Sequence, residues 1–61
     1  MRWIKTLDYL PQEGVKVLTK IDDEHGCRNE QVLFRLGSLW YTTGFNPTYV
    51  YYVPTHWRLW K

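Results

Sequence analysis

The alternation of apolar and polar residues along this chain predicts β-strands, and its clearest segment is 30–43, EQVLFRLGSLWYTT. Two runs of strand-forming residues flank Gly37-Ser38, and a glycine at the first of two central positions is typical of a type II′ turn. The segment is therefore predicted to be a β-hairpin with a two-residue loop. Because such a loop fixes the register, we expect these cross-strand pairs: Leu36 with Leu39, Arg35 with Trp40, Phe34 with Tyr41, and Val32 with Thr43.

Side chains alternate between the two faces of a strand, which divides the residues of this hairpin into two sets. One face is expected to carry Phe34, Leu36, Leu39 and Tyr41, and the other Leu33, Arg35 and Trp40. Aromatic and β-branched pairs on neighbouring strands stabilise sheets. Phe34 and Tyr41 are therefore predicted to be structural residues of the sheet core.

Four other segments have strand character. Residues 15–21 place Val15, Val17, Thr19 and Ile21 on one face, which predicts a strand whose other face is largely solvated. Residues 49–53, YVYYV, are apolar or aromatic on both faces, which predicts an interior strand covered on both sides. Residues 1–5 are expected to form a short first strand. Residues 55–61 resume the alternation, with Trp57, Leu59 and Lys61 on one side and His56, Arg58 and Trp60 on the other.

The intervening segments contain turn residues and are expected to connect the strands. Pro11 and Gly14 lie in the connection 6–14, and Asn46-Pro47 lies in the connection 44–48. Residues 22–29, DDEHGCRN, are polar and are expected to form a mobile loop. No segment has a helical period over ten or more residues. The chain is therefore predicted to be all-β, a small antiparallel meander or SH3-like open barrel of four to six short strands.

The length of 61 residues predicts a single domain over 1–61. Four Trp, five Tyr and two Phe are many for so short a chain, and we expect their rings to supply much of the buried surface in place of a disulfide or a metal. One cysteine, Cys27, has no internal partner and fits a reducing cytoplasm. The sequence has no long apolar run and no signal-peptide pattern, so we expect no membrane association.

Residues with catalytic or metal-binding chemistry are few and isolated. The four glycines form no phosphate-binding loop, and Ser38 lies in a tight turn outside any nucleophile motif. Cys27 lies in an acidic stretch, which makes a thiol less reactive. His25 and Cys27 offer only two ligands, whereas a zinc site takes four. We therefore expect no enzymatic activity, no metal site and no cofactor.

Aromatic and basic residues of the predicted strands are the candidates for partner binding, namely Arg35, Trp40, His56, Arg58 and Trp60. The Arg35 guanidinium either stacks on Trp40 within the fold or forms an exposed recognition element with it. His56 either contacts a partner or packs among aromatic rings with its nitrogens bonded to the backbone.

Nucleic-acid binding is an alternative for a basic, aromatic β-domain. Single-strand binders combine stacking rings with a basic groove, which Lys16, Lys20, Arg35 and Arg58 would line here. Eight basic and six acidic residues are mixed along the chain, however, and a net charge of +2 does not by itself favour a polyanion.

Several short motifs resemble a known family. They are Trp3-Ile4, then Leu10-Pro11 with Gly14 and Val17-Leu18, then Trp40, and finally Pro54-Thr55-His56-Trp57 followed by Leu59. This pattern resembles a family of small phage and prophage proteins, classed as a domain of unknown function, whose members open with W-I, carry L-P-x-x-G-x-x-V-L and end in T-H-W. The resemblance implies a phage-encoded accessory protein in a bacterial cytoplasm, and it implies no particular activity or cofactor. For the motif residues we expect structural roles, with Trp3 and Trp57 packed together to close the sheet end to end.

From these features we expect a non-enzymatic phage or prophage accessory protein. It would bind a host or phage protein through an aromatic sheet face or an edge strand. Single-stranded nucleic-acid or nucleotide binding and burial of the aromatic residues in a homodimer are the alternatives.

Overall fold

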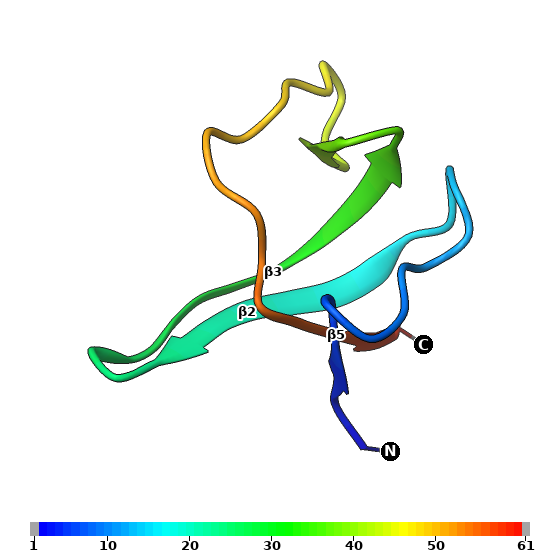
Figure 1. The fold of residues 1–61 in the computed structure, drawn as a ribbon. Helices are drawn as coiled ribbons and strands as arrows, with labels where there is room; N and C mark the ends of the chain where they lie inside the picture. The colour runs from blue at the N-terminus through cyan, green and yellow to red at the C-terminus, as the bar shows by residue number, and fades with distance from the viewer. Residues whose placement is uncertain (1, 61) are drawn as a thin grey trace.

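A computed structural model describes residues 2–60, so the expectations for Met1 and Lys61 lie outside the described residues. The described chain has five strands: β1 (Ile4–Lys5), β2 (Val17–Asp23), β3 (Gly26–Leu36), β4 (Leu39–Thr42) and β5 (His56–Leu59). They pair antiparallel in one open sheet of order β1-β5-β2-β3-β4 (Figure 1). This confirms the predicted class, an all-β meander or open barrel. No helix among residues 2–60 is long and apolar enough to cross a membrane.

The last strand, β5, lies between β1 and β2, so segments from the two ends of the chain pair with each other (Figure 1). Trp57 of β5 is paired with Ile4 on one side and with Thr19 on the other. Because β1 has only two residues, its place in the sheet depends on this pairing with β5. The two ends of the chain thus pair side by side within an open sheet.

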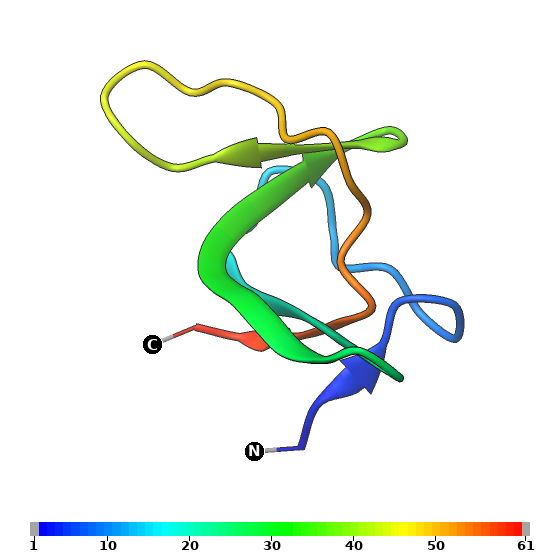
Figure 2. The same ribbon diagram turned by 90° about the vertical axis from the view of Figure 1, so that its left-hand side faces the viewer.

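The sheet curls, and β3 bends strongly along its length (Figure 2). The β2–β3 register shifts between Thr19 and Ile21, and Asn29 on the opposite strand has φ +58°. An extra residue at a bulge bends its strand and increases the local twist. The sheet therefore has a concave and a convex face, and residues 6–16 and 50–55 run over the concave side (Figure 2).

The central hairpin has the predicted turn and register. Its pairs are Leu36 with Leu39, Arg35 with Trp40, Phe34 with Tyr41, and Leu33 with Thr42. Gly37 has φ +62° and Ser38 has no positive φ, which fits a type II′ turn. β4 ends at Thr42, so the expected pair of Val32 with Thr43 lies just beyond the ladder.

The expectation of a loop over 22–29 is wrong, because these residues form the end of the β2–β3 hairpin. β2 continues to Asp23 and β3 begins at Gly26, so only two residues form the turn. The Asp23 carboxylate accepts hydrogen bonds from the His25 backbone N–H and from Arg28 Nη1, both at 2.9 Å. Gly26 has φ +111°, which residues with a side chain rarely adopt. These local features let a polar sequence form a tight hairpin.

The expectation of an interior strand over 49–53 is also wrong. Tyr49 makes one isolated bridge to Tyr41, and the chain then bends away from the sheet. Tyr51 is 91% exposed and Val53 is 59% exposed. The interior position beside β2 is occupied by β5, so this segment has only the edge of β4 to pair with.

The core lies on the concave face and is small. Its buried apolar side chains are Val17, Leu33, Trp40 and Trp57, with Ile4 and Val50 packed against them. Trp40 and Trp57 are the only buried aromatic side chains in the described residues, whereas Phe45 and Tyr51 are almost fully exposed. The aromatic residues are thus divided between core and surface. We expected their rings to supply much of the buried surface, but only two of the described rings lie in the core.

Phe34 and Tyr41 lie on the convex face, outside this core. Their rings stack with centroids 5.5 Å apart at an interplanar angle of 16°, and both side chains are half-buried. The predicted division of the hairpin into two faces is correct, but the core forms on the face of Leu33 and Trp40. The reason is that residues 6–16 and 50–55 cover that face (Figure 2).

The expected packing of Trp3 on Trp57 is not found. Because side chains alternate, Ile4 shares the concave face with Trp57, and Trp3 lies on the convex face. There the Trp3 ring has Lys20 Nζ 4.3 Å and Arg58 Cζ 5.0 Å from its centroid. Trp3 therefore stabilises the sheet through two cations and not through Trp57.

Candidate functional site

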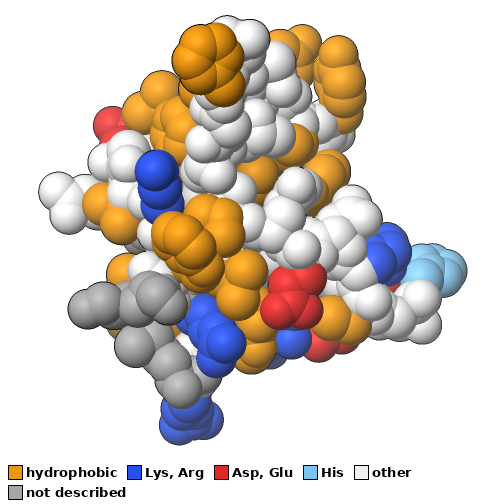
Figure 3. Space-filling view, turned by 180° about the vertical axis from the view of Figure 1, so that it is seen from behind, with side chains coloured by type: hydrophobic (Ala, Val, Ile, Leu, Met, Phe, Trp, Pro, Cys, Tyr) orange, Lys and Arg blue, Asp and Glu red, His pale blue; other side chains and the backbone are white. Residues whose placement is uncertain are grey.

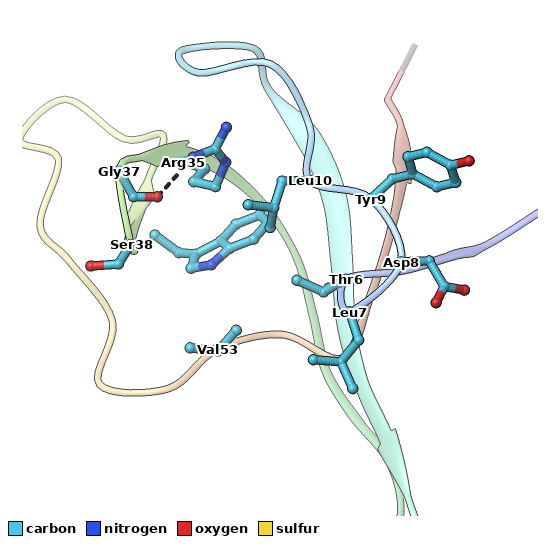
Figure 4. Close-up of a pocket in the computed structure, with 10 residues that line it drawn as sticks. Thr6, Leu7, Asp8, Tyr9, Leu10, Arg35, Gly37, Ser38 and Val53 are labelled. Carbon is cyan, nitrogen blue, oxygen red and sulfur yellow. Dashed lines mark hydrogen bonds between the residues drawn. The ribbon is translucent and has the colours of Figure 1, made fainter.

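Two connections on the concave side of the sheet border a groove (Figure 4). One follows β1 and the other precedes β5, and they are joined where the Thr6 backbone N–H donates to the Thr55 carbonyl at 2.9 Å. Trp40, whose side chain is 1% exposed, lines the space between them and forms its buried base. We call this space, lined by Leu7, Tyr9, Leu10, Trp40 and Val53 with Thr6, the concave groove.

Arg35 fixes the connection that follows β1. Its Nε and Nη2 donate to the Pro11 carbonyl at 3.1 and 2.8 Å, and its Nη1 donates to the Gly37 carbonyl at 2.8 Å (Figure 4). The Gly14 backbone N–H in turn donates to the Arg35 carbonyl at 3.0 Å. A planar guanidinium with several fixed donors suits such a multiple contact. Arg35 is therefore a positioning residue for the groove wall.

Trp57 is the second anchor of the same connection. Its indole Nε1 donates to the Tyr9 carbonyl at 2.8 Å, while its ring lies in the core. The backbone carbonyls of Tyr9 and Pro11 are thus both bound by side chains of the sheet. This leaves the side chains of Leu7, Tyr9 and Leu10 exposed along a backbone that is held in place.

The groove consists of two adjoining hollows, of about 620 Å³ and about 350 Å³. Both are lined by Thr6, Leu7 and Val53, so they form one continuous surface. Three lining side chains are apolar and well exposed: Leu7 (98%), Val53 (59%) and Leu10 (53%). The Tyr9 ring points away from this space (Figure 4). In Figure 4, Leu7, Leu10 and Val53 lie around the same open space. The groove therefore offers apolar surface that this fold leaves in contact with water.

Polar groups in the groove are few. The Thr6 Oγ1 atom is buried and has no hydrogen-bond partner among the described residues. Thr6 lines both hollows. Asp8 and Ser38 also line the larger hollow. Such a lining binds mainly by burying apolar surface, while a few polar groups set the orientation of the ligand.

The charged residues of the β2–β3 hairpin lie outside this groove. Hydrogen bonds from the Arg28 side chain and the His25 backbone N–H lower the pKa of Asp23 to about 2, and the same carboxylate raises the pKa of Arg28. His25 Nε2 is 3.5 Å from the Glu24 carboxylate, and Cys27 is exposed. No group of three or more His, Cys, Asp or Glu within residues 2–60 is placed to hold a metal ion.

The convex face carries a second group of side chains. The rings of four aromatic residues, Phe34, Tyr41, Tyr49 and Tyr51, lie in a row with successive centroids 5.5, 6.5 and 5.2 Å apart. Figure 3 shows this face, where Lys and Arg side chains in blue are set among hydrophobic side chains in orange.

The predicted binding residues are divided between these two surfaces. Arg35 and Trp40 line the larger hollow and His56 lines the smaller one. Arg58 is on the convex face, and Trp60, 53% exposed, follows β5. The interpretation of Trp40 as an exposed recognition residue is wrong, because its side chain is in the core and can only form the base of a site.

Sequence reasoning did not identify Leu7, Leu10 and Val53. A signal is present in TLDYLP, where three apolar or aromatic residues lie within a predicted connection that contains no strand. Apolar side chains in a connection must either be buried by a neighbouring element or remain exposed. Here they remain exposed.

Comparison with known protein families, curated proteins and solved structures gave no match for this chain. The resemblance to the phage family therefore stays a prediction.

Proposed function

We propose that this chain is a non-enzymatic module that binds another protein through the concave groove. The observation that supports the proposal is the group of three exposed apolar side chains around one groove, Leu7, Leu10 and Val53 (Figure 4). Contiguous apolar surface on a small protein is typical of a protein-binding site.

The ligand that fits this groove is a short extended segment with two apolar side chains. In an extended segment, residues i and i+2 project to the same side, so two such side chains enter the two adjoining hollows. Arg35 and Trp57 already hold the groove wall in place. A wall that is fixed before binding loses little conformational entropy when the ligand arrives, which favours affinity.

The motifs shared with small phage and prophage proteins suggest where the partner is found. We propose a host or phage protein of the bacterial cytoplasm as the source of the bound segment. The predicted aromatic sheet face and edge strand are replaced in this proposal by the concave groove, because the edge strand β4 is partly covered by Tyr49.

Selection from a displayed library of short random peptides on the immobilised chain tests the proposal. Bound peptides would then be compared on Leu7→Ser and Phe45→Ser, since both side chains are 98% exposed but only Leu7 lines the groove. We expect peptides rich in apolar residues, with an affinity at least about tenfold lower for the Leu7 variant and unchanged for the Phe45 variant. Recovery of no peptide, or an equal response of the two variants, contradicts the proposal.

A further inference from the structure

A row of basic residues crosses three neighbouring strands on the convex face. Lys5 of β1 and Lys20 of β2 are both paired with His56 of β5, so the three side chains stand abreast on one side of the sheet. Neighbouring strands lie only about 4.8 Å apart, so Lys5 and Lys20 stand about two strand spacings from each other, with His56 between them. The arrangement gathers two lysine charges on one side of the sheet.

The acidic residues of the fold neutralise the positive charge of this row only in part. Asp22 Oδ2 lies 3.3 Å from Lys20 Nζ. Among the described residues, no carboxylate lies within ion-pair distance of Lys5 or His56. The row therefore retains positive charge that an anion would neutralise.

Trp3 brings a further cation to the same place. Lys20 Nζ and Arg58 Cζ lie 4.3 and 5.0 Å from the centroid of its ring, so the indole holds both cations on the convex face. Together with Lys5 and His56, these residues make what we call the cationic end of the convex face.

The aromatic row lies at the other end of the same face. Leu18 is paired with Val32, and Phe34 follows two residues further along β3, so the row begins about 13 Å from Lys20 along the strands. Phe34 is stacked on Tyr41, and Tyr49 continues the row across the edge of β4.

We infer that the convex face binds single-stranded nucleic acid. The cationic end, Lys5, Lys20, His56 and Arg58, receives the phosphate backbone, and bases stack on the aromatic row of Phe34, Tyr41 and Tyr49. Single-strand binders use this combination of a basic track and ring platforms, because every base has a flat face and every nucleotide a negative charge. Lys5 and His56 also line the smaller hollow of the concave groove, whereas Lys20, Arg58 and the aromatic row line neither hollow. The inference therefore does not depend on the function proposed for that groove.

The ion pair of Asp22 with Lys20 provides the sharpest test, because Asp22 competes with a bound phosphate. Binding of a fluorescent oligothymidylate at low salt would be measured by anisotropy. Asp22→Asn removes the competing charge and is expected to tighten binding several-fold. Asp8→Asn makes the same charge change on the concave side and is expected to leave the affinity nearly unchanged. An equal effect of the two variants would show non-specific attraction and overturn the inference.

Two further matched pairs separate the phosphate and base contacts. With the three permanent cations Lys5, Lys20 and Arg58 on phosphates, log K should fall with log salt concentration with a slope of about −2, and Arg58→Gln should reduce that slope by about 0.7. Arg28→Gln, at the ion-paired hairpin turn, should not change it. Tyr49→Leu should weaken binding at least about fivefold, whereas Phe45→Leu should have no effect. Circular dichroism would confirm that each variant is folded.

Two results would overturn the inference directly. One is the absence of oligothymidylate binding by the wild-type chain at low salt. The other is an equal affinity for inorganic polyphosphate, which carries the charges without the bases and would leave the aromatic row without a role in binding.

Discussion

Trp57 donates its indole N–H to the backbone carbonyl of Tyr9 at 2.8 Å, across 48 positions of the sequence. This bond joins a strand in the interior of the sheet to the connection that forms one wall of the concave groove. The same indole lies in the core, so one side chain contributes both to the stability of the fold and to the shape of its surface.

Replacement of Trp57 by phenylalanine keeps a ring in the core and removes the donor. We expect the free energy of unfolding to fall by about 1–3 kcal/mol, because the Tyr9 carbonyl loses its partner and the smaller ring leaves a gap. Urea denaturation measures the change. Trp60→Phe is the control, since its half-exposed ring should alter stability by no more than about 0.5 kcal/mol. Equal effects of the two substitutions would argue against the anchoring role of Trp57.

Two buried threonines should respond in opposite ways to replacement by valine. Thr19 Oγ1 donates to the Gln31 carbonyl at 2.9 Å, so Thr19→Val should lower the free energy of unfolding by about 1 kcal/mol. The Thr6 hydroxyl has no partner among the described residues, so Thr6→Val should be neutral or slightly stabilising. Thermal unfolding of the two variants checks this difference. A clear loss of stability in the Thr6 variant would mean that its hydroxyl is bonded in solution.

Glycines at positions 37 and 44 should also differ when replaced by alanine. A Cβ atom at either position would meet no atom within 4 Å, so steric contact does not distinguish them. Gly37 has φ +62°, and alanine there should destabilise the hairpin by about 1–2 kcal/mol. Gly44 has no positive φ, and Gly44→Ala should be neutral or stabilise the chain slightly by restricting the unfolded state. Denaturant midpoints of the two variants measure the contrast, which would vanish if the type II′ turn were not formed.

The Asp23 carboxyl should titrate well below its ordinary range. Its pKa is lowered to about 2 by the Arg28 side chain and the His25 backbone N–H, so the folded state binds a proton less readily than the unfolded state. The stabilisation from this contact is therefore fully present above about pH 4 and is lost as the pH falls towards 2. A pH titration of the Asp23 side-chain signals by NMR measures the midpoint. In Arg28→Gln the midpoint should return towards 3.8, and an unchanged midpoint would contradict the assigned cause.

The central hairpin could be predicted because its turn, register and faces are determined by residues close together in the sequence. Gly37 sets the turn, the turn sets the register, and alternation then assigns each side chain to a face. Which of the two faces is buried is not local information. That depends on the connections carrying Leu10 and Val50, which reach the side of Trp40 and not that of Phe34.

The two errors in strand assignment have a similar origin. The apolar run 49–53 has strong strand propensity, but β5 takes the interior position and leaves this run at an edge. The polar segment 22–29 has weak propensity, but Asp23 and Arg28 bond across it and Gly26 completes its turn. Segment 49–53 forms no interior strand because β5 occupies that place in the sheet. Segment 22–29 forms a hairpin because its side chains bond to each other across the turn.

The candidate groove was only partly predictable. Residue type predicts Arg35 and Trp40 as binding residues, and both line the groove. Arg35 holds the groove wall through its hydrogen bonds to the Pro11 carbonyl, and Trp40 forms the buried base. The exposed side chains of Leu7 and Val53 come from segments 46 positions apart, and sequence pattern alone does not bring such segments together.

The place of β5 in the sheet also sets the order in which the molecule can assemble. The β2–β3 and β3–β4 hairpins join neighbours in sequence and can form early, since little chain entropy is lost in closing them. β1 has no neighbour until β5 has inserted beside β2, so the N-terminal residues remain unpaired until the last strand arrives. Folding should therefore finish with one slow, long-range insertion, and the groove beside Tyr9 would take shape only at that final step.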